Sequence, residues 1–166
     1  MRWSFSLTEN QSASEVKKGD DLHVMWRIPF QPGTLKAISR KNGKTVVETE
    51  IKTAGNPSNL KLTADRSTIK ADGNDLSFVT VDILDAKGTL APNANNEINF
   101  SLKGNGKIVG VCSGDPVSHE SYKGTKHTAL AGKCLVIVQS DTKTGRLELT
   151  AKANGLKPAT IVITAE

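Results

Sequence analysis

Carboxylates are plentiful in this chain, which has 17 aspartates and glutamates. A pair of them can act as general acid and base, as in glycoside hydrolysis, when a cleft holds the two about 5 to 9.5 Å apart. Most of them fall in turns or on the polar side of alternating segments, and Asp72, Asp75, Asp82, Asp85 and Asp115 are examples. Aspartate beside glycine is typical of a turn, because its side chain accepts a hydrogen bond from the backbone two residues on. The pattern predicts structural carboxylates and no catalytic residue.

Two cysteines flank two histidines along the chain: Cys112, His119, His127 and Cys134. Structural zinc sites use short knuckles such as C-x₂₋₄-C with H-x₃₋₅-H, whereas six, seven and six residues separate these four. The spacing does not favour zinc, and we expect both histidines, which lie in a polar stretch, at the surface. A disulfide would require the cysteines to lie on neighbouring strands. We expect two free, mostly buried thiols, because buried cysteine is a common small hydrophobe.

Two further ligand sites can be tested against the sequence. Four residues could offer oxygens to calcium: Asp65, Asp72, Asn74 and Asp75. Calcium needs about six or more oxygens, and a turn at Asp72-Gly73 already accounts for these residues. The glycines of GNGKIVG at 104–110 resemble a phosphate loop, but no helical pattern follows to offer N–H groups to a phosphate. The sequence therefore predicts no metal and no cofactor.

The segment 114–131, GDPVSHESYKGTKHTALA, is long for a connection in a compact β domain, where about four to six residues are usual. Connections of this length are commonly either functional or disordered. We predict that this one is a contact surface, and its candidate residues are polar or aromatic: His119, Glu120, Tyr122, Lys123 and His127.

The formal charge of +5 and the pI of 9.3 raise the question of nucleic-acid binding. The basic residues are spread thinly, and their one cluster, Arg40, Lys41 and Lys44, surrounds an Asn42-Gly43 turn without the aromatic residues that stack on bases. No window approaches the ~20 apolar residues of a membrane span, and the first residues lack the apolar core of a signal peptide. We expect neither a nucleic acid nor a membrane as partner.

Strands must position all of these side chains. Val79, Val81 and Ile83 alternate with polar residues, the period of a strand with one buried face. Seven segments of this kind follow one another with turn residues between nearly every pair: 59–65, 75–85, 97–104, 106–113, 133–140, 145–153 and 159–165. No amphipathic helical pattern competes, so the sequence predicts an all-β sandwich. A (β/α)₈ barrel, at about 250 residues, does not fit in 166.

A turn-rich linker at 53–58 divides the chain into modules at 1–52 and 59–166. The first module offers a strand around residues 3–7, a polar stretch at 12–21, a strand at 22–28 and a hairpin centred on Asn42-Gly43. About four strands are too few for a sandwich of about seven, so this module is expected to be truncated. We expect the strand at 22–28 to expose an apolar face of Val24, Trp26 and Ile28, and the chain to form a homodimer through this module.

Longer motifs give the chain a family resemblance. WRIPFQPGTLKAISRKNGKTV at 26–46 is similar to the end of the penultimate β-sandwich of family 2 glycoside hydrolases of the β-galactosidase type from gut Bacteroidetes. TAGNPSNLKLTADRSTIKADGNDLSFVTVDILD, GNGKIVGVCSGDPVSHESYKG and GKCLVIVQS resemble the family's last domain, which is immunoglobulin-like. The N-terminal FSLTENQSASEV departs from the pattern, because the family shows an Asn-Gly turn where this chain has Asn10-Gln11.

The resemblance implies an all-β fold, with an immunoglobulin-like sandwich preceded by a partial sandwich module. It also implies a non-catalytic accessory role in a longer, secreted β-galactosidase in the periplasm or outside the cell, because the family's catalytic glutamates lie on an upstream barrel. The expected partners are upstream domains or other subunits of that enzyme. Two alternatives are open, a carbohydrate-binding module and an adhesin-type spacer. A sugar-binding face would need exposed aromatic residues, and the candidates Trp3, Trp26 and Tyr122 are few and scattered.

Overall fold

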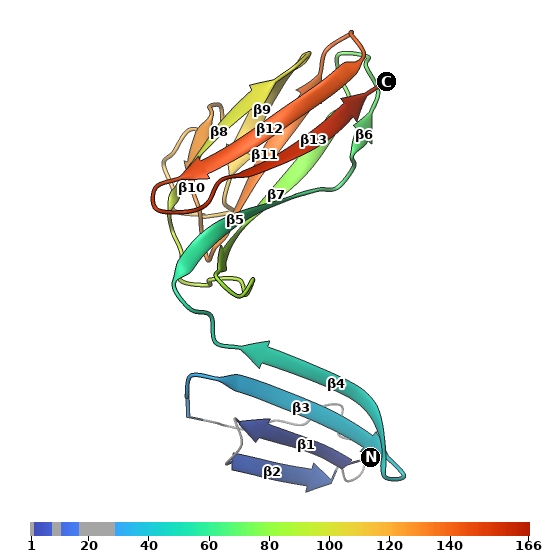
Figure 1. Ribbon diagram of the computed structural model, residues 1–166, viewed down its shortest axis with the longest axis vertical. Helices are drawn as coiled ribbons and strands as arrows, with labels where there is room; N and C mark the ends of the chain where they lie inside the picture. Colours follow the sequence, from blue (N-terminus) through green and yellow to red (C-terminus); the bar gives the residue numbers. More distant parts are fainter. Residues whose placement is uncertain (1, 8–10, 17–28) are drawn as a thin grey trace. The chain divides into compact units, whose positions relative to one another are not determined.

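The computed structural model describes the backbone of residues 2–7 and 11–16 and both backbone and side chains of residues 29–166. The chain forms two compact units, Met1–Thr53 and Ala54–Glu166. All regular secondary structure in the described ranges is β-strand, as Figure 1 shows. In the part of the chain that is described, no helix is long and apolar enough to cross a membrane.

The first unit contains a four-stranded antiparallel sheet in the order β2-β1-β3-β4. Its strands are β1 (Arg2–Leu7), β2 (Gln11–Val16), β3 (Thr34–Lys41) and β4 (Lys44–Lys52). The hairpin predicted at Asn42-Gly43 is confirmed, and both residues have positive φ, 51° and 79°, as a type I′ turn requires. The polar stretch at 12–21 contains most of β2, a strand that was not predicted. The predicted strand at 22–28 lies outside the described residues.

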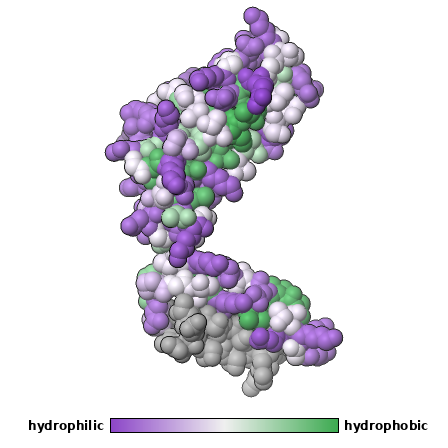
Figure 2. Space-filling view, viewed as in Figure 1, coloured by the Kyte–Doolittle hydropathy of each residue, from purple (hydrophilic) through white to green (hydrophobic). Residues whose placement is uncertain are grey.

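Strand β4 is one of the two outer strands of this sheet in the described part of the chain, and all nine of its residues are exposed. Three of them are large and apolar: Val46, Val47 and Ile51 are 53%, 50% and 69% exposed. Figure 2 shows hydrophobic surface over the turn end of the β3–β4 hairpin. An outer strand with apolar side chains and unpaired backbone groups is a site where another strand can add.

The second unit is a sandwich of two sheets, seen as two layers in Figure 1. One sheet has the order β5-β7-β11-β9: β5 (Pro57–Ala64), β7 (Leu76–Asp85), β11 (Lys133–Ser140) and β9 (Gly106–Cys112). The other has the order β10-β8-β12-β13-β6: β10 (Lys126–Thr128), β8 (Glu97–Lys103), β12 (Gly145–Ala153), β13 (Ala159–Ala165) and β6 (Thr68–Ile69). The order β5-β7-β11-β9 corresponds to strands A, B, E and D of an immunoglobulin constant-type sandwich, and β8-β12-β13 corresponds to strands C, F and G. The short strands β10 and β6 are additions at the two edges of the second sheet.

The predicted all-β sandwich is confirmed, and so are its seven strands, to within two residues at each end. Alternation places the core: Val79, Val81 and Ile83 of β7 are fully buried, and Leu147 and Leu149 of β12 meet them from the other sheet. Two short strands, β6 and β10, were not predicted. Each has three residues or fewer, too few for a period of two to be visible.

The buried carboxylate of Asp85 joins the start of this unit to the end of β7. Asp85 is 3% exposed and accepts hydrogen bonds of 2.8 Å from the backbone N–H groups of Gly55, Lys87 and Thr89. These hydrogen bonds hold the pKa of Asp85 below its ordinary value, and the bond from Gly55 N is the largest cause. Asp85 is therefore structural, as predicted for the turn aspartates, and β5 begins at Pro57, inside the predicted linker.

Candidate contact surface in the segment 114–131

The segment 114–131 is anchored to the sandwich and is not a single loop. Lys126–Thr128 forms β10, which pairs with β8, so the interpretation of 114–131 as one connection is wrong at this point. Before β10, the Tyr122 carbonyl accepts a hydrogen bond from Val111 N at 2.9 Å, and the Thr125 carbonyl accepts one from Phe100 N at 2.7 Å. Because Val111 and Phe100 belong to different sheets, these two bonds fix the segment to both layers of the sandwich.

Glu120 closes the segment on itself. Its carboxylate accepts hydrogen bonds from the Thr128 hydroxyl at 2.7 Å and from Thr128 N at 2.8 Å. His127 Nδ1 lies 3.1 Å from the Glu120 Oε2 atom. The hydrogen bonds from Thr128 are the main reason that the pKa of Glu120 is below its ordinary value. The Glu120 carboxylate therefore links the part of the segment that precedes β10 to β10 itself.

His127 is buried, with 1% of its surface exposed, so the prediction that both histidines are solvated surface groups is wrong for this one. It lies opposite Ile98 in the β10–β8 ladder and so faces the core with it. Its Nδ1 is close to two acceptors, the Thr128 carbonyl at 2.9 Å and Glu120, and therefore carries a hydrogen. Its Nε2 has no hydrogen-bond partner among the residues that the structure describes.

Tyr122 lies on the outside of this cluster. Its ring is stacked on that of His127, with the centroids 6.1 Å apart and the planes 11° from parallel. Tyr122 is nevertheless 58% exposed, and two other apolar side chains of the segment also face solvent, Val117 at 77% and Leu130 at 41%. His119 and Lys123 are exposed, as predicted. The segment thus exposes apolar side chains, while hydrogen bonds within it and to both sheets fix its backbone.

Four of the five predicted contact residues, Glu120, Tyr122, Lys123 and His127, take part in the contacts within the segment. Glu120 lies against His127, Tyr122 stacks on His127, and Lys123 caps the turn by donating its N–H to the Ser121 hydroxyl at 3.2 Å. His119 has no side-chain contact with them that the structure records. Sequence inspection missed Thr128, which supplies both strong hydrogen bonds to Glu120, because eight residues separate the two and no local motif connects them.

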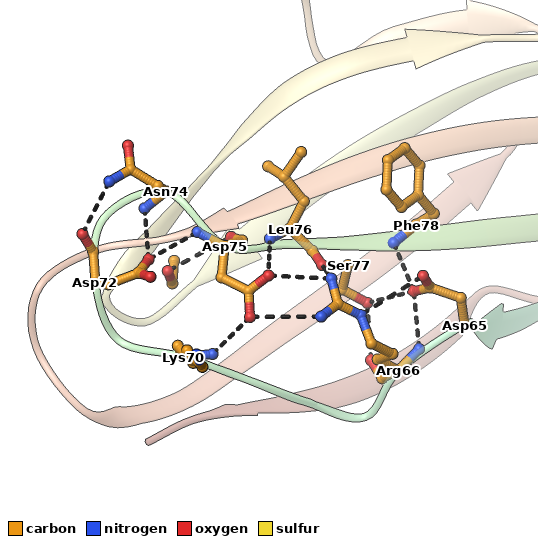
Figure 3. Close-up of polar contacts among 10 residues, drawn as sticks. Asp65, Arg66, Lys70, Asp72, Asn74, Asp75, Leu76, Ser77 and Phe78 are labelled. Atoms are coloured by element: carbon orange, nitrogen blue, oxygen red, sulfur yellow. Dashed lines mark hydrogen bonds and ion pairs between the residues drawn. The ribbon is translucent and has the colours of Figure 1, made fainter.

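The residues weighed for calcium form a closed hydrogen-bond network at the other end of the unit, drawn in Figure 3. Asp75 accepts hydrogen bonds from Lys70 N at 2.8 Å and Leu76 N at 2.9 Å, and it pairs with Arg66 at 3.1 Å. The bond from Lys70 N is the largest cause of the lowered pKa of Asp75. Asp72 accepts bonds from Asn74 N and Asp75 N, both at 2.8 Å. These oxygens stabilise turns, and no three ligand-type side chains gather for a metal within the described ranges.

The two cysteines lie on adjacent strands but face opposite sides of their sheet. Cys134 is buried and shares the core face with Val81, whereas Cys112 lies opposite Leu135 on the outer face. Both are free, and the Cys134 thiol donates to the Cys112 carbonyl at 3.3 Å. Burial raises the pKa of the Cys134 thiol to about 12. A disulfide between them would require one strand to turn over, because directly paired residues share a face.

Comparison with known proteins agrees with the resemblance seen in the motifs. Residues 60–162 match the model of the glycoside hydrolase family 2 C-terminal domain 5, and residues 7–47 match a domain of unknown function. A β-galactosidase of Bacteroides ovatus, BoGH2A, is 54% identical over 162 residues, which are 96% of this chain and 19% of that protein. A β-galactosidase of Thermoanaerobacter pseudethanolicus is 32% identical over 121 residues, 73% of this chain and 14% of that protein.

Solved structures give the same result. A glycosyl hydrolase family 2 member from Bacteroides cellulosilyticus superposes with a TM-score of 0.93 at 33% identity, over 99% of this chain and 21% of that one. A β-glycosidase from Bacteroides vulgatus superposes with a TM-score of 0.88 at 27% identity, again over 99% of this chain and 21% of that one. The chain thus spans about a fifth or less of the length of the curated relatives named here.

Proposed function

This chain belongs to glycoside hydrolase family 2, whose C-terminal domain 5 it contains, and we propose that it is a non-catalytic accessory region of a longer enzyme of the β-galactosidase type. One observation carries the proposal. A β-galactosidase with 54% identity matches 96% of this chain using only 19% of its own length, so in that protein the matching region is a small part of a larger polypeptide.

The chemistry of the described residues supports an accessory role. Asp65, Asp72, Asp75, Asp85 and Glu120 each accept hydrogen bonds from nearby backbone or hydroxyl groups. Carboxylates held in this way stabilise turns and loops, whereas glycoside hydrolysis requires two that face each other across a cleft. A hollow of about 280 Å³ on the second unit has no carboxylate in its lining.

The simplest test of the catalytic part uses the 166-residue chain and its parent enzyme side by side. We expect the full-length enzyme to hydrolyse an aryl β-galactoside and the purified chain to give no rate above background. Measurable hydrolysis by the chain, reduced by substitution of any of its carboxylates, would contradict the proposal. So would a parent gene that encodes further sandwich domains and no catalytic domain, because that arrangement belongs to an adhesin-type spacer.

Within this role, we propose that the exposed side chains of 114–131 contact another domain or subunit of the enzyme. The supporting observation is that Val117 and Tyr122 are largely exposed although their segment is anchored at both sheets and at Glu120. An apolar surface that is already ordered loses little conformational entropy when it binds. The double substitution Val117→Lys with Tyr122→Lys tests the surface without removing β10.

The expected result in the full-length enzyme is a change in oligomeric mass or in kcat/KM. The control is Val162→Lys, which introduces one lysine on the outer face of β13, opposite Glu148. If mass and kcat/KM are both unchanged in the double variant, the segment is not a contact surface.

A carbohydrate-binding role is the second candidate, and the exposed ring of Tyr122 stacked on His127 is the observation that favours it. Sugar platforms use apolar and aromatic surface together with convergent polar groups, and this segment offers Tyr122 without a tryptophan, a phenylalanine or a second tyrosine. We therefore expect calorimetric titration of the 166-residue chain with galactose or lactose to show no millimolar binding. Binding that Tyr122→Ala abolishes would favour the second candidate.

A further inference from the structure

The outer face of the β5-β7-β11-β9 sheet carries a group of apolar side chains, Phe78, Leu135 and Ile137, where a solvated sheet face is normally polar. Directly paired residues share a face, so the register places Thr80, Leu135 and Cys112 in one row across β7, β11 and β9. Phe78 and Ile137 lie in the next row, with Gly110 as their neighbour on β9. The side chains of the core, such as Val79 and Val136, point to the opposite side.

Phe78 projects from this face on a backbone that is held in place. It is 39% exposed, the largest exposed apolar side chain of β7. Asp65 accepts a hydrogen bond from Phe78 N at 2.8 Å just beyond the end of β5, and Arg66 donates to the Leu76 carbonyl. Figure 3 shows the side chains of Leu76 and Phe78 pointing away from this polar network, to the same side of the strand. The ring is therefore presented to solvent by an ordered scaffold.

A hollow of about 280 Å³ lies on the same face beside the row of Thr80. Its lining comes from β7, β11 and β9 and from the two residues after β9: Thr80, Cys112, Ser113, Gly114, Lys133, Cys134 and Leu135. The volume is just below the range of about 300 to 1,000 Å³ that is usual for small-molecule pockets. A projecting ring next to a shallow hollow is a shape that fits a protein surface with one protruding side chain.

The charges along the edge of the hollow indicate what that surface carries. Asp82 forms its ion pair with Lys133 at 2.6 Å, and Lys61 lies on the other side of Asp82 in the β5–β7 register. Lys61 and Lys133 thus flank one carboxylate in the register, and among the described residues only Lys133 is recorded in an ion pair with it. A partner that supplies a second carboxylate would balance them, because opposite charges at a contact favour one docking register over others.

We propose that this outer face, defined by Phe78, Thr80, Cys112, Leu135 and Ile137, docks against another folded part of the same polypeptide, outside these 166 residues, which inserts an aliphatic side chain into the hollow and places a carboxylate near Lys61. The inference rests on the proposed function. The choice of occupant follows from length: the relative at 54% identity and the structure with a TM-score of 0.93 each contain this region as about a fifth of one chain.

The thiol of Cys112 is a natural reporter for the experiment. Its side chain is half-buried on the outer face, whereas the Cys134 side chain is buried on the core face and serves as an unreactive internal control. The rate of alkylation of Cys112 is measured by peptide mass spectrometry in the 166-residue chain and in the full-length enzyme, with a small maleimide as the probe. We expect the rate in the full-length enzyme to be at least about 10-fold lower.

Two variants of the full-length enzyme locate the protection. Phe78→Lys is expected to return the Cys112 rate to that of the 166-residue chain, whereas Val162→Lys, on the outer face of the other sheet, is expected to leave the protection intact. Equal Cys112 rates in the two proteins overturn the proposal. So does protection within the 166-residue chain that grows with its concentration, because the occupant is then a second copy. Failure of the proposed function is seen separately, as a full-length enzyme without glycosidase activity.

Discussion

The carboxylate of Glu120 is expected to determine whether the segment 114–131 stays on the sandwich, and Glu120→Gln tests this with little change in shape. Glu120 accepts two hydrogen bonds from Thr128 and lies 3.1 Å from His127 Nδ1. The amide retains one acceptor oxygen and turns an N–H group toward a donor. Hydrogen bonds to a charged group contribute about 1.5 to 3 kcal/mol each. Because the Glu120 side chain is 37% exposed, solvent screening reduces the loss to about 1 to 2 kcal/mol.

The assay is thermal unfolding of the 166-residue chain followed by circular dichroism, together with hydrogen exchange at Thr128 N. For a sandwich of this size, a loss of 1 kcal/mol lowers Tm by roughly 4 °C, so we expect a decrease of roughly 4 to 8 °C and faster exchange at Thr128. The matched control is Glu97→Gln, which removes the exposed ion pair of Glu97 with Lys126 and no backbone hydrogen bond that the structure records. Exposed pairs of this kind contribute about 0 to 1 kcal/mol.

The pH dependence gives an independent check. The pKa of Glu120 is lowered in the folded chain from 4.5, so its stabilisation is fully present above pH 4.5 and is lost as the pH falls through the lower, folded pKa. The Tm difference between the natural chain and Glu120→Gln should therefore be largest at neutral pH and should narrow in acid. Equal Tm changes for the Glu120 and Glu97 variants, or a difference that is constant from neutral pH into acid, would refute the argument.

Three further outcomes are expected. Thiol counting under denaturing, non-reducing conditions should find two free thiols, and a count of zero would show a disulfide. In the native chain only Cys112 should react, because burial and a pKa of about 12 keep Cys134 from forming a thiolate. Gly132→Ala should lower the free energy of unfolding by at least ~2 kcal/mol more than Gly88→Ala. Both glycines have positive φ, but a Cβ added to Gly132 would lie 2.4 Å from the Ala91 carbonyl oxygen, whereas a Cβ added to Gly88 meets nothing within 4 Å. Similar losses for the two variants would contradict this. Light scattering should find the 166-residue chain dimeric through β4, with Val47→Lys giving a monomer; a monomeric natural chain would show that this edge does not self-associate.

Much of the second unit could be predicted because its strands carry strong alternation. The alternation of Val79, Val81 and Ile83 with polar residues indicates a strand with one buried face. Glycine and aspartate mark the turns between the strands. The strands that sequence inspection missed lack this signal. β2 is QSASEV, with few apolar side chains to alternate, and β10 is three residues held by pairing with β8.

The interior of the contact segment could not be predicted for a different reason. His127 lies in a polar stretch, and its burial depends on β8 lying beside it and on Glu120 folding back over β10. The face prediction for Val24, Trp26 and Ile28 concerns residues outside the described ranges.

The sequence alone determined the fold class, the seven main strands, the hairpin at Asn42-Gly43 and the family resemblance, because these depend on local period, turn chemistry and motif. Only the tertiary structure decided which cysteine faces the core, that Glu120 binds Thr128, and that Phe78 and the hollow at Cys112 share one face. Such contacts join residues far apart in the chain. They follow from the register of paired strands, and a shift of one residue in a register exchanges the two faces of a sheet.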